Sequence, residues 1–136
     1  MTLELIVNRD AAQTDVHKIA RAVYAECGAS SLAAVEALCA MIANVARTTG
    51  RAYVDVACDE QILPAQSVSS RYFDRMQAPA TSRGFQMCLR VARRMMTGSL
   101  ADVCRGAVRF HHADELPEWA LARGYIADID GMLFYR

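Results

Sequence analysis

Residues 17–31, HKIARAVYAECGASS, place a carboxylate where an amphipathic helix normally carries apolar side chains. An α-helix turns about 100° per residue, so Ile19, Val23 and Glu26 project within roughly 60° of one another. Both burial and the C-terminal end of a helix dipole favour the protonated form of a carboxyl group. A protonated glutamic acid in a cleft is the proton donor of glycoside cleavage. The alternative is a partly exposed helix-end glutamate paired with an arginine such as Arg21 or Arg47.

A cysteine and two adjacent histidines offer other chemistries. Cys27 with a downstream histidine would suggest a cysteine hydrolase that cleaves peptides. Its side chain, however, points about 100° away from that of Glu26, which is typical of a packing cysteine. The segment FHHAD offers a metal cluster, but only one imidazole of an adjacent pair faces each side of a strand. A metal would therefore need a ligand from elsewhere, such as His17, and we predict no metal site.

The composition indicates one domain, residues 1–136, and excludes several classes of protein. Lysines plus arginines equal aspartates plus glutamates at 15 each, so no overall basic field favours nucleic acid. The five cysteines include no CxxC pair, and we therefore expect a reducing compartment. The apolar run at the N-terminus is too short and too acidic for a signal peptide, and no apolar stretch is expected to span a membrane. We expect synthesis in the cytoplasm, with action at the cell wall or periplasm only after export or release.

Hydrophobic spacing predicts an α+β domain that is mainly α-helical. Helices are expected at about 15–27, 31–48 and 85–96, the first with Asp15 as its N-cap and the second capped by Ser30 or Ser31. Residues 62–84 are rich in Ser, Pro and Gln and predict a long surface loop, preceded by AYVDVAC as a helical turn or short strand. In the C-terminal third, GAVRFHH, GYIADI and MLFYR predict small antiparallel strands.

Two segments carry ordered motifs that cover residues 17–48 and 85–136 well and the region between them loosely. IARAVYAECGASSLAAVEALCAMIANVA is similar to a helix ending in Tyr-Ala-Glu-Ala-Arg-Gly-Glu, followed by a helix with Ala-Val-X-X-Val-X-X-Asn-Arg. GAVRFHHADELPEWALARGYIADIDGMLFYR is similar to Gly-Ala-X-X-Phe/Tyr-His, Pro-X-Trp and Ile-Gly-X-His-X-Phe-Tyr. In this order and spacing they resemble the SleB-type cell-wall hydrolase domain. The matching residues are Tyr24, Ala25, Glu26, Gly28, Asn44, Gly106, Ala107, Phe110, His111, Pro117, Trp119, Ile129, Phe134 and Tyr135.

The resemblance implies a lysozyme-like fold, with a helical core and a small antiparallel sheet, that acts on peptidoglycan glycan strands. It implies cleavage between N-acetylmuramic acid and N-acetylglucosamine, as by a lytic transglycosylase or a muramidase. Glu26 would be the catalytic general acid and then the base. The resemblance implies no metal and no cofactor.

Five further residues are candidates for substrate binding, and each has a structural alternative. His111 would orient substrate or be a hydrogen-bonded strand histidine. Trp119 and Tyr135 would stack on sugar rings or pack in the core. Tyr24 and Phe110 would line the cleft, with Tyr24 equally suited to anchoring its helix.

The chain departs from the family pattern at three places. The second acidic residue after the glycine is missing, since Ala29 and Ser30 stand there. Val45 replaces the arginine after the helix-two asparagine, and Met132 replaces the terminal histidine. These departures keep open a non-catalytic wall-binding or assembly module that has retained the fold.

Overall fold

The computed structural model describes the backbone of residues 3–136 and the side chains from residue 13 onward. Helices make up 51% of the chain, and the three described strands form one antiparallel sheet, which confirms the α+β, mainly α class. In order, the elements are α1 (Leu3–Cys27), α2 (Leu32–Thr49), α3 (Tyr53–Ala57), η1 (Pro64–Gln66), η2 (Phe73–Gln77), α4 (Arg83–Met96), β1 (Arg109–His112), η3 (Glu118–Ala120), β2 (Ala127–Ile129) and β3 (Met132–Tyr135).

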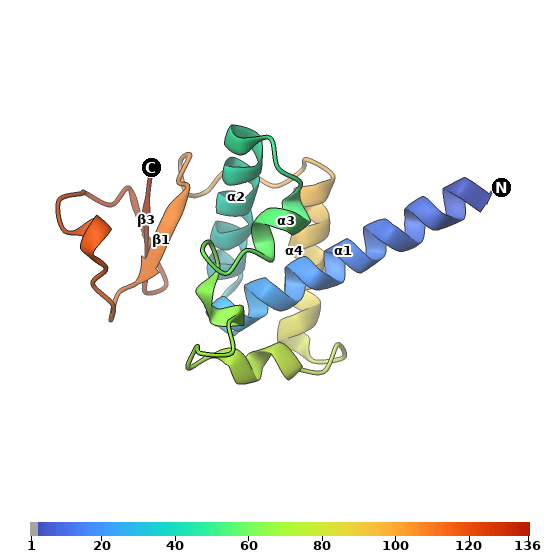
Figure 1. Cartoon of the computed structure of the whole chain (residues 1–136), viewed down its shortest axis with the longest axis horizontal. Helices are drawn as coiled ribbons and strands as arrows, with labels where there is room; N and C mark the ends of the chain where they lie inside the picture. Colours follow the sequence, from blue (N-terminus) through green and yellow to red (C-terminus); the bar gives the residue numbers. More distant parts are fainter. Residues whose placement is uncertain (1–2) are drawn as a thin grey trace.

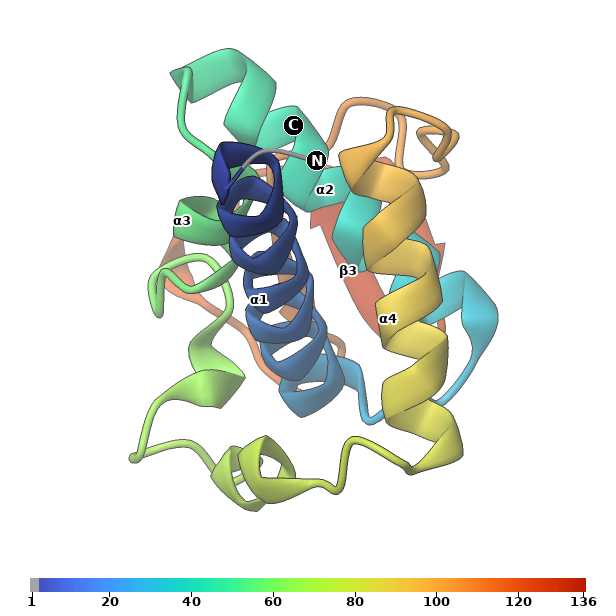
Figure 2. The same ribbon diagram turned by 90° about the vertical axis from the view of Figure 1, so that its right-hand side faces the viewer.

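The helix α1 is the central element of the bundle. It packs against α4 on one side and α3 on the other, as the view along its length shows (Figure 2). The sheet lies beyond α2, at the opposite end of the molecule from the N-terminus (Figure 1). The first turns of α1 extend past the other elements, whereas its last turn ends in the middle of the fold (Figure 1). The residue at that C-terminal end therefore faces several elements at once.

The helix boundaries follow local capping signals except at the start of α1. The Ser31 hydroxyl accepts a hydrogen bond from the Ala34 amide at 3.1 Å and caps α2, which ends at Gly50 with φ +71°. The prediction that Asp15 begins the first helix is wrong, because α1 already begins at Leu3. Residues 3–14 contain neither proline nor glycine, so nothing in them stops a helix.

The segment between α2 and α4 is more ordered than the predicted surface loop. It contains α3 and the two 3₁₀ helices η1 and η2, which lie along α1. Leu63 and Ala65 are buried, and the Gln66 side-chain amide donates to the carbonyls of Ala57 and Leu63 at 2.8 and 3.1 Å. These hydrogen bonds tie η1 to the end of α3, and both elements pack against α1.

The sheet has the strand order β1-β3-β2, with both pairs antiparallel as predicted. Phe110 pairs with Phe134, and His112 pairs with Met132. Asp130 and Gly131 form a two-residue turn between β2 and β3 at φ +51° and +79°. Asp-Gly is a favoured sequence for such turns, because aspartate tolerates and glycine readily adopts positive φ.

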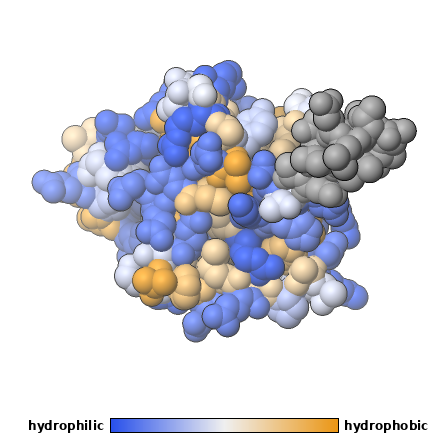
Figure 3. Space-filling view, turned by 45° about the vertical axis from the view of Figure 1, so that its right-hand side comes forward, coloured by the Kyte–Doolittle hydropathy of each residue, from blue (hydrophilic) through white to orange (hydrophobic). Residues whose placement is uncertain are grey.

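The helix α2 is long and apolar enough to cross a membrane by length and composition alone, although we expected no such stretch. The core helix of a soluble protein passes the same test, and 61% of this helix is buried inside the fold. The surface seen in Figure 3 is mainly hydrophilic, with small hydrophobic patches between the charged side chains. The largest fully buried side chains are Phe85, Phe134, Ile19, Leu38, Met41 and Ile42.

Candidate active site

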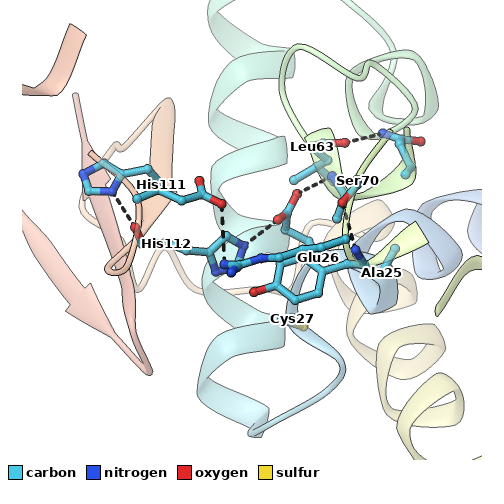
Figure 4. A network of polar contacts seen from close by, with 12 residues as sticks. Ala25, Glu26, Cys27, Leu63, Ser70, His111 and His112 are labelled. Atoms are coloured by element: carbon cyan, nitrogen blue, oxygen red, sulfur yellow. Dashed lines mark hydrogen bonds and ion pairs between the residues drawn. The ribbon is translucent and has the colours of Figure 1, made fainter. Parts of the chain in front are cut away.

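Glu26 lies in the last turn of α1 and is only 2% exposed, yet none of the arginines whose side chains are described forms a hydrogen bond or ion pair with it. The Ala65 amide donates to its Oε1 at 3.1 Å, and Nε2 of His112 lies 2.6 Å from its Oε2 (Figure 4). The Arg21 guanidinium instead donates to the carbonyls of Met76 and Ala78. The arginine-paired alternative for Glu26 is therefore not the arrangement that forms.

Two elements far apart in the sequence supply the partners of Glu26. Ala65 is the second residue of η1, directly after Pro64, and the first amides of a helix have no partner within it. That free amide is the donor to Glu26. His112 ends β1, and alternation along the strand places it on the same face as Phe110. The ring centroids of Phe110 and His112 lie 5.6 Å apart, in an edge-on contact.

The contact between His112 and Glu26 joins a buried carboxylate to a titratable imidazole. Hydrogen bonding to Glu26 raises the pKa of His112, which outweighs the opposite effect of its burial. Asp114 and Glu115 add smaller effects in the same upward direction. The imidazole therefore keeps its proton to higher pH than a free histidine, and the pair can hold a proton beside the cleft.

A main cleft of about 540 Å³ opens over this pair. Residues 60–72, which include η1 and end where η2 begins, form one wall, and β1 with the residues after it forms the other. Arg71 joins the two walls through ion pairs with Asp114 at 2.6 Å and Glu115 at 3.7 Å. The cleft is lined by Glu26, Glu60, Gln61, Pro64, Ala65, Ser67, Ser69, Ser70, Arg71, Tyr72, Phe110, His111, His112 and Glu115.

Two smaller hollows adjoin the main cleft. An outer groove of about 290 Å³ shares Gln61, Pro64 and Phe110 with it and extends to Arg109 and Trp119. A side cavity of about 140 Å³ shares Glu26, Tyr72 and His112 with the main cleft. The side cavity is lined by Glu26, Cys27, Ser30, Tyr72, Arg75, His112, Asp130 and Met132. The Glu26–His112 pair therefore borders both the main cleft and the side cavity, whereas the outer groove does not reach it.

Three of the candidate substrate-binding residues form one aromatic cluster away from Glu26. Nε2 of His111 lies 2.7 Å from the Tyr135 hydroxyl, and Nδ1 lies 2.7 Å from the carbonyl of His112. Because a carbonyl only accepts, Nδ1 carries the proton and the Tyr135 hydroxyl donates to Nε2. The edge of the Trp119 ring meets Tyr135 at a centroid distance of 5.0 Å. Figure 4 shows the His111 ring turned away from Glu26 and the His112 ring turned toward it.

The other predicted residues lie in different surroundings. Phe110 lines both the main cleft and the outer groove. Trp119 lines the outer groove, with the Arg109 guanidinium 4.1 Å above its ring. The Tyr24 ring instead faces the start of α4, where a Cβ on Gly84 would come within 2.7 Å of its Cε2. Tyr24 thus occupies the anchoring position that was its structural alternative.

Neither a thiol–imidazole pair nor a metal cluster forms at this site. The Cys27 thiol donates to the Val23 carbonyl at 3.3 Å, whereas His112 is engaged by Glu26. His17 packs against the Phe85 ring. It lies nine residues before Glu26 on α1, whereas His111 and His112 lie on β1. Among the residues whose side chains are described, no three His, Cys, Asp or Glu residues gather in a way that could hold a metal ion.

Asn44 ties β1 to the helical core. Its side-chain amide donates to the Ala107 carbonyl at 3.1 Å and to the Asp102 carboxylate at 3.3 Å. Asp102 in turn accepts from the Gly106 amide at 2.7 Å. This network fixes the loop that leads into β1, and it thereby helps to fix the strand that carries His112.

Sequence reasoning missed the two groups that contact Glu26. His112 could have been chosen, because the alternation of β1 puts it with Phe110 and puts His111 on the opposite face. The Ala65 amide gives no side-chain signal in the sequence. No protein-family model, curated protein or solved structure matches this chain.

Proposed function

We propose that this protein cleaves the glycan strands of peptidoglycan between N-acetylmuramic acid and N-acetylglucosamine, with Glu26 as the general acid. The observation that carries the proposal is a buried carboxylate at the edge of a cleft, held by an amide and a histidine. An arginine would keep the carboxylate ionised, whereas a protonatable histidine can exchange a proton with it. The resemblance to the SleB-type domain supplies the substrate class.

In the proposed reaction, the Glu26–His112 pair delivers a proton to the glycosidic oxygen as its bond to the anomeric carbon breaks. Where a hydroxyl of the sugar itself attacks the anomeric carbon, as in a lytic transglycosylase, Glu26 then accepts the proton of that hydroxyl. The Ala65 amide stabilises the carboxylate formed after the first transfer, because its hydrogen bond favours the charged form. General acid–base catalysis of this kind contributes typically about 10²–10⁴-fold to a rate.

His112 has a supporting role in this scheme. Its raised pKa lets it carry the proton of the pair near neutral pH, so that Glu26 can be reprotonated between turnovers. Its side chain is 16% exposed, against 2% for Glu26, so it also gives the pair a route to solvent. Phe110 and Tyr72 flank the imidazole, with ring centroids 5.6 and 5.5 Å away, and limit its movement.

The departures at Ser30 and Met132 favour a second candidate, a non-catalytic module that binds the wall. The third alternative, a cysteine–histidine peptidase, has less support because the Cys27 thiol faces the Val23 carbonyl rather than an imidazole. These three functions differ in the products that they release from purified peptidoglycan.

The test is incubation of purified peptidoglycan with the wild type, Glu26→Gln and Glu36→Gln, followed by mass analysis of the soluble muropeptides. Glu36→Gln is the matched control, because Glu36 on α2 forms an ion pair with Arg94 on α4 and does not line the main cleft. We expect glycan cleavage by the wild type and Glu36→Gln and none by Glu26→Gln. Cleaved peptide stems with intact glycan would favour the peptidase, and wall binding with no release would favour the binding module.

A further inference from the structure

The side cavity lies against the Glu26–His112 pair and is bounded by the turn between β2 and β3. Glu26, His112 and Asp130 all line it. Its volume is about 140 Å³, whereas the main cleft measures about 540 Å³. At about 30 Å³ per water molecule, the side cavity has room for about four to five waters. Its size and polar lining suit water better than a sugar chain.

Asp130 is held in place by the two chain segments that carry the pair. Its Oδ2 accepts hydrogen bonds from the hydroxyls of Ser30 at 2.5 Å and Ser31 at 3.0 Å. Ser30 follows Glu26 by four residues. On the other side, Ala113 directly follows His112, and its amide donates to the Gly131 carbonyl at 2.8 Å. The turn is therefore fixed relative to both members of the pair.

The Asp130 carboxylate is charged, and one of its two oxygens accepts no hydrogen bond from the described residues. Hydrogen bonds from the Ser30 and Ser31 hydroxyls lower its pKa, so it is ionised at neutral pH. Both of those bonds go to Oδ2, and no described residue donates a hydrogen bond to Oδ1. Arg75 also lines the cavity, but its guanidinium donates to the Ala25 carbonyl and stacks over Tyr72. Oδ1 can thus accept a hydrogen bond from water.

We infer that Asp130 is a second catalytic carboxylate, which binds and deprotonates a water molecule in the side cavity, and that the enzyme is a hydrolase. This inference rests on the proposed function. The Glu26–His112 pair gives its proton to the leaving glycosidic oxygen as the bond from that oxygen to the anomeric carbon breaks. The water oxygen bonds to the anomeric carbon, and one water proton passes to Asp130. The net reaction adds one water to the glycosidic bond. Asp130 then loses its proton to solvent, and the Glu26–His112 pair takes up one proton from solvent through the partly exposed His112.

The inference also accounts for a departure from the family pattern. Ser30 stands where the family's second acidic residue is expected, and the Asp130 carboxylate lies against its hydroxyl. In this chain the carboxylate at this part of the site is supplied by the β2–β3 turn rather than by the segment that follows α1. The acid and the base then come from different elements that meet at one cavity.

The test compares the wild type with Asp130→Asn and with Asp128→Asn as the matched control. Asparagine keeps an oxygen acceptor for the serines and tolerates the positive φ of this turn, so the variant is expected to fold. Asp128 is exposed on the same hairpin and does not line the side cavity. Each protein is incubated with purified peptidoglycan, and hydrolysed ends are separated by mass from 1,6-anhydro ends, which are lighter by one water.

We expect the wild type and Asp128→Asn to release hydrolysed ends, and Asp130→Asn to release them at least about 100-fold more slowly. Anhydro ends alone from the wild type, or hydrolysed ends from Asp130→Asn at the wild-type rate, would overturn the inference and leave the proposed function in place. No release of glycan fragments by the wild type would overturn both.

Discussion

Replacing His112 by alanine leaves the buried Glu26 carboxyl with one hydrogen-bond donor, the Ala65 amide. Removing one partner of a buried ion pair costs about 3–5 kcal/mol, and leaving a buried acceptor unsatisfied costs about 1–3 kcal/mol. The His112 side chain is 16% exposed, so water can enter the vacated space and partly solvate Glu26. The cost should therefore lie near the boundary between these two ranges. We expect the free energy of unfolding to fall by about 2–3 kcal/mol, which corresponds to about 7–10 °C in Tm for a domain of this size.

The loss should depend on pH in one direction. Hydrogen bonding to Glu26 raises the pKa of His112 above its ordinary value of 6.5, so the charged imidazole stabilises the fold fully below pH 6.5. That contribution disappears as the pH rises through the raised pKa. The difference in unfolding free energy between the wild type and His112→Ala should therefore be larger at pH 6 than at pH 9.

Urea unfolding at the two pH values, followed by circular dichroism, measures this difference. His112→Gln is the control, because glutamine offers a neutral N–H near the position of Nε2 but cannot titrate. Its unfolding free energy relative to His112→Ala should not vary between pH 6 and pH 9. A difference between the wild type and His112→Ala that is the same at both pH values would refute the charged contact.

Two further predictions concern stability. Gly84→Ala should destabilise the protein by about 1–3 kcal/mol in thermal melts, because the new Cβ would lie 2.7 Å from Cε2 of Tyr24; Gly124→Ala, which meets nothing within 4 Å, should change little, and equal melts for the two variants would contradict the packing described. Arg71→Ala should leave the urea-unfolding midpoint almost unchanged, because the ion pairs of Arg71 across the cleft are exposed. A clear fall in that midpoint would mean that Arg71 holds the cleft walls together.

The sequence predicted the fold class and most helix ends because these depend on local signals. Ser31 caps α2 and is one of the two serines expected to do so, and α2 ends at Thr49, one residue beyond the expected end. Asp15 misled the prediction of α1, because residues that suit an N-cap also occur inside helices that continue upstream. The helical turn at α3 was one of the two structures expected for AYVDVAC. The order within residues 62–84 was missed for a related reason: short buried pieces such as η1 are too brief to show a hydrophobic period.

The site was only partly predictable because its partners come from distant segments. The position of Glu26 on the apolar side of α1 was visible in the sequence, and the residue is buried as expected. Ala65 and His112 lie 39 and 86 residues away, and only the folded chain brings them to Glu26. The resemblance drew attention to His111, whereas strand alternation alone favours His112 as the neighbour of Phe110. Asp130 is positioned by a turn, and its distance from Glu26 in the sequence gave no reason to connect them.

The measurement that tests the central claim most directly is the initial rate of muropeptide release by the wild type and Glu26→Gln, with wall binding measured by co-sedimentation in the same samples. Glutamine keeps the shape of the side chain and removes the proton donor. We predict equal wall binding and a rate at least about 100-fold lower for Glu26→Gln. Equal rates for the two proteins, or wall binding without release by either, would contradict the assignment of Glu26 as the general acid of a glycan-cleaving enzyme.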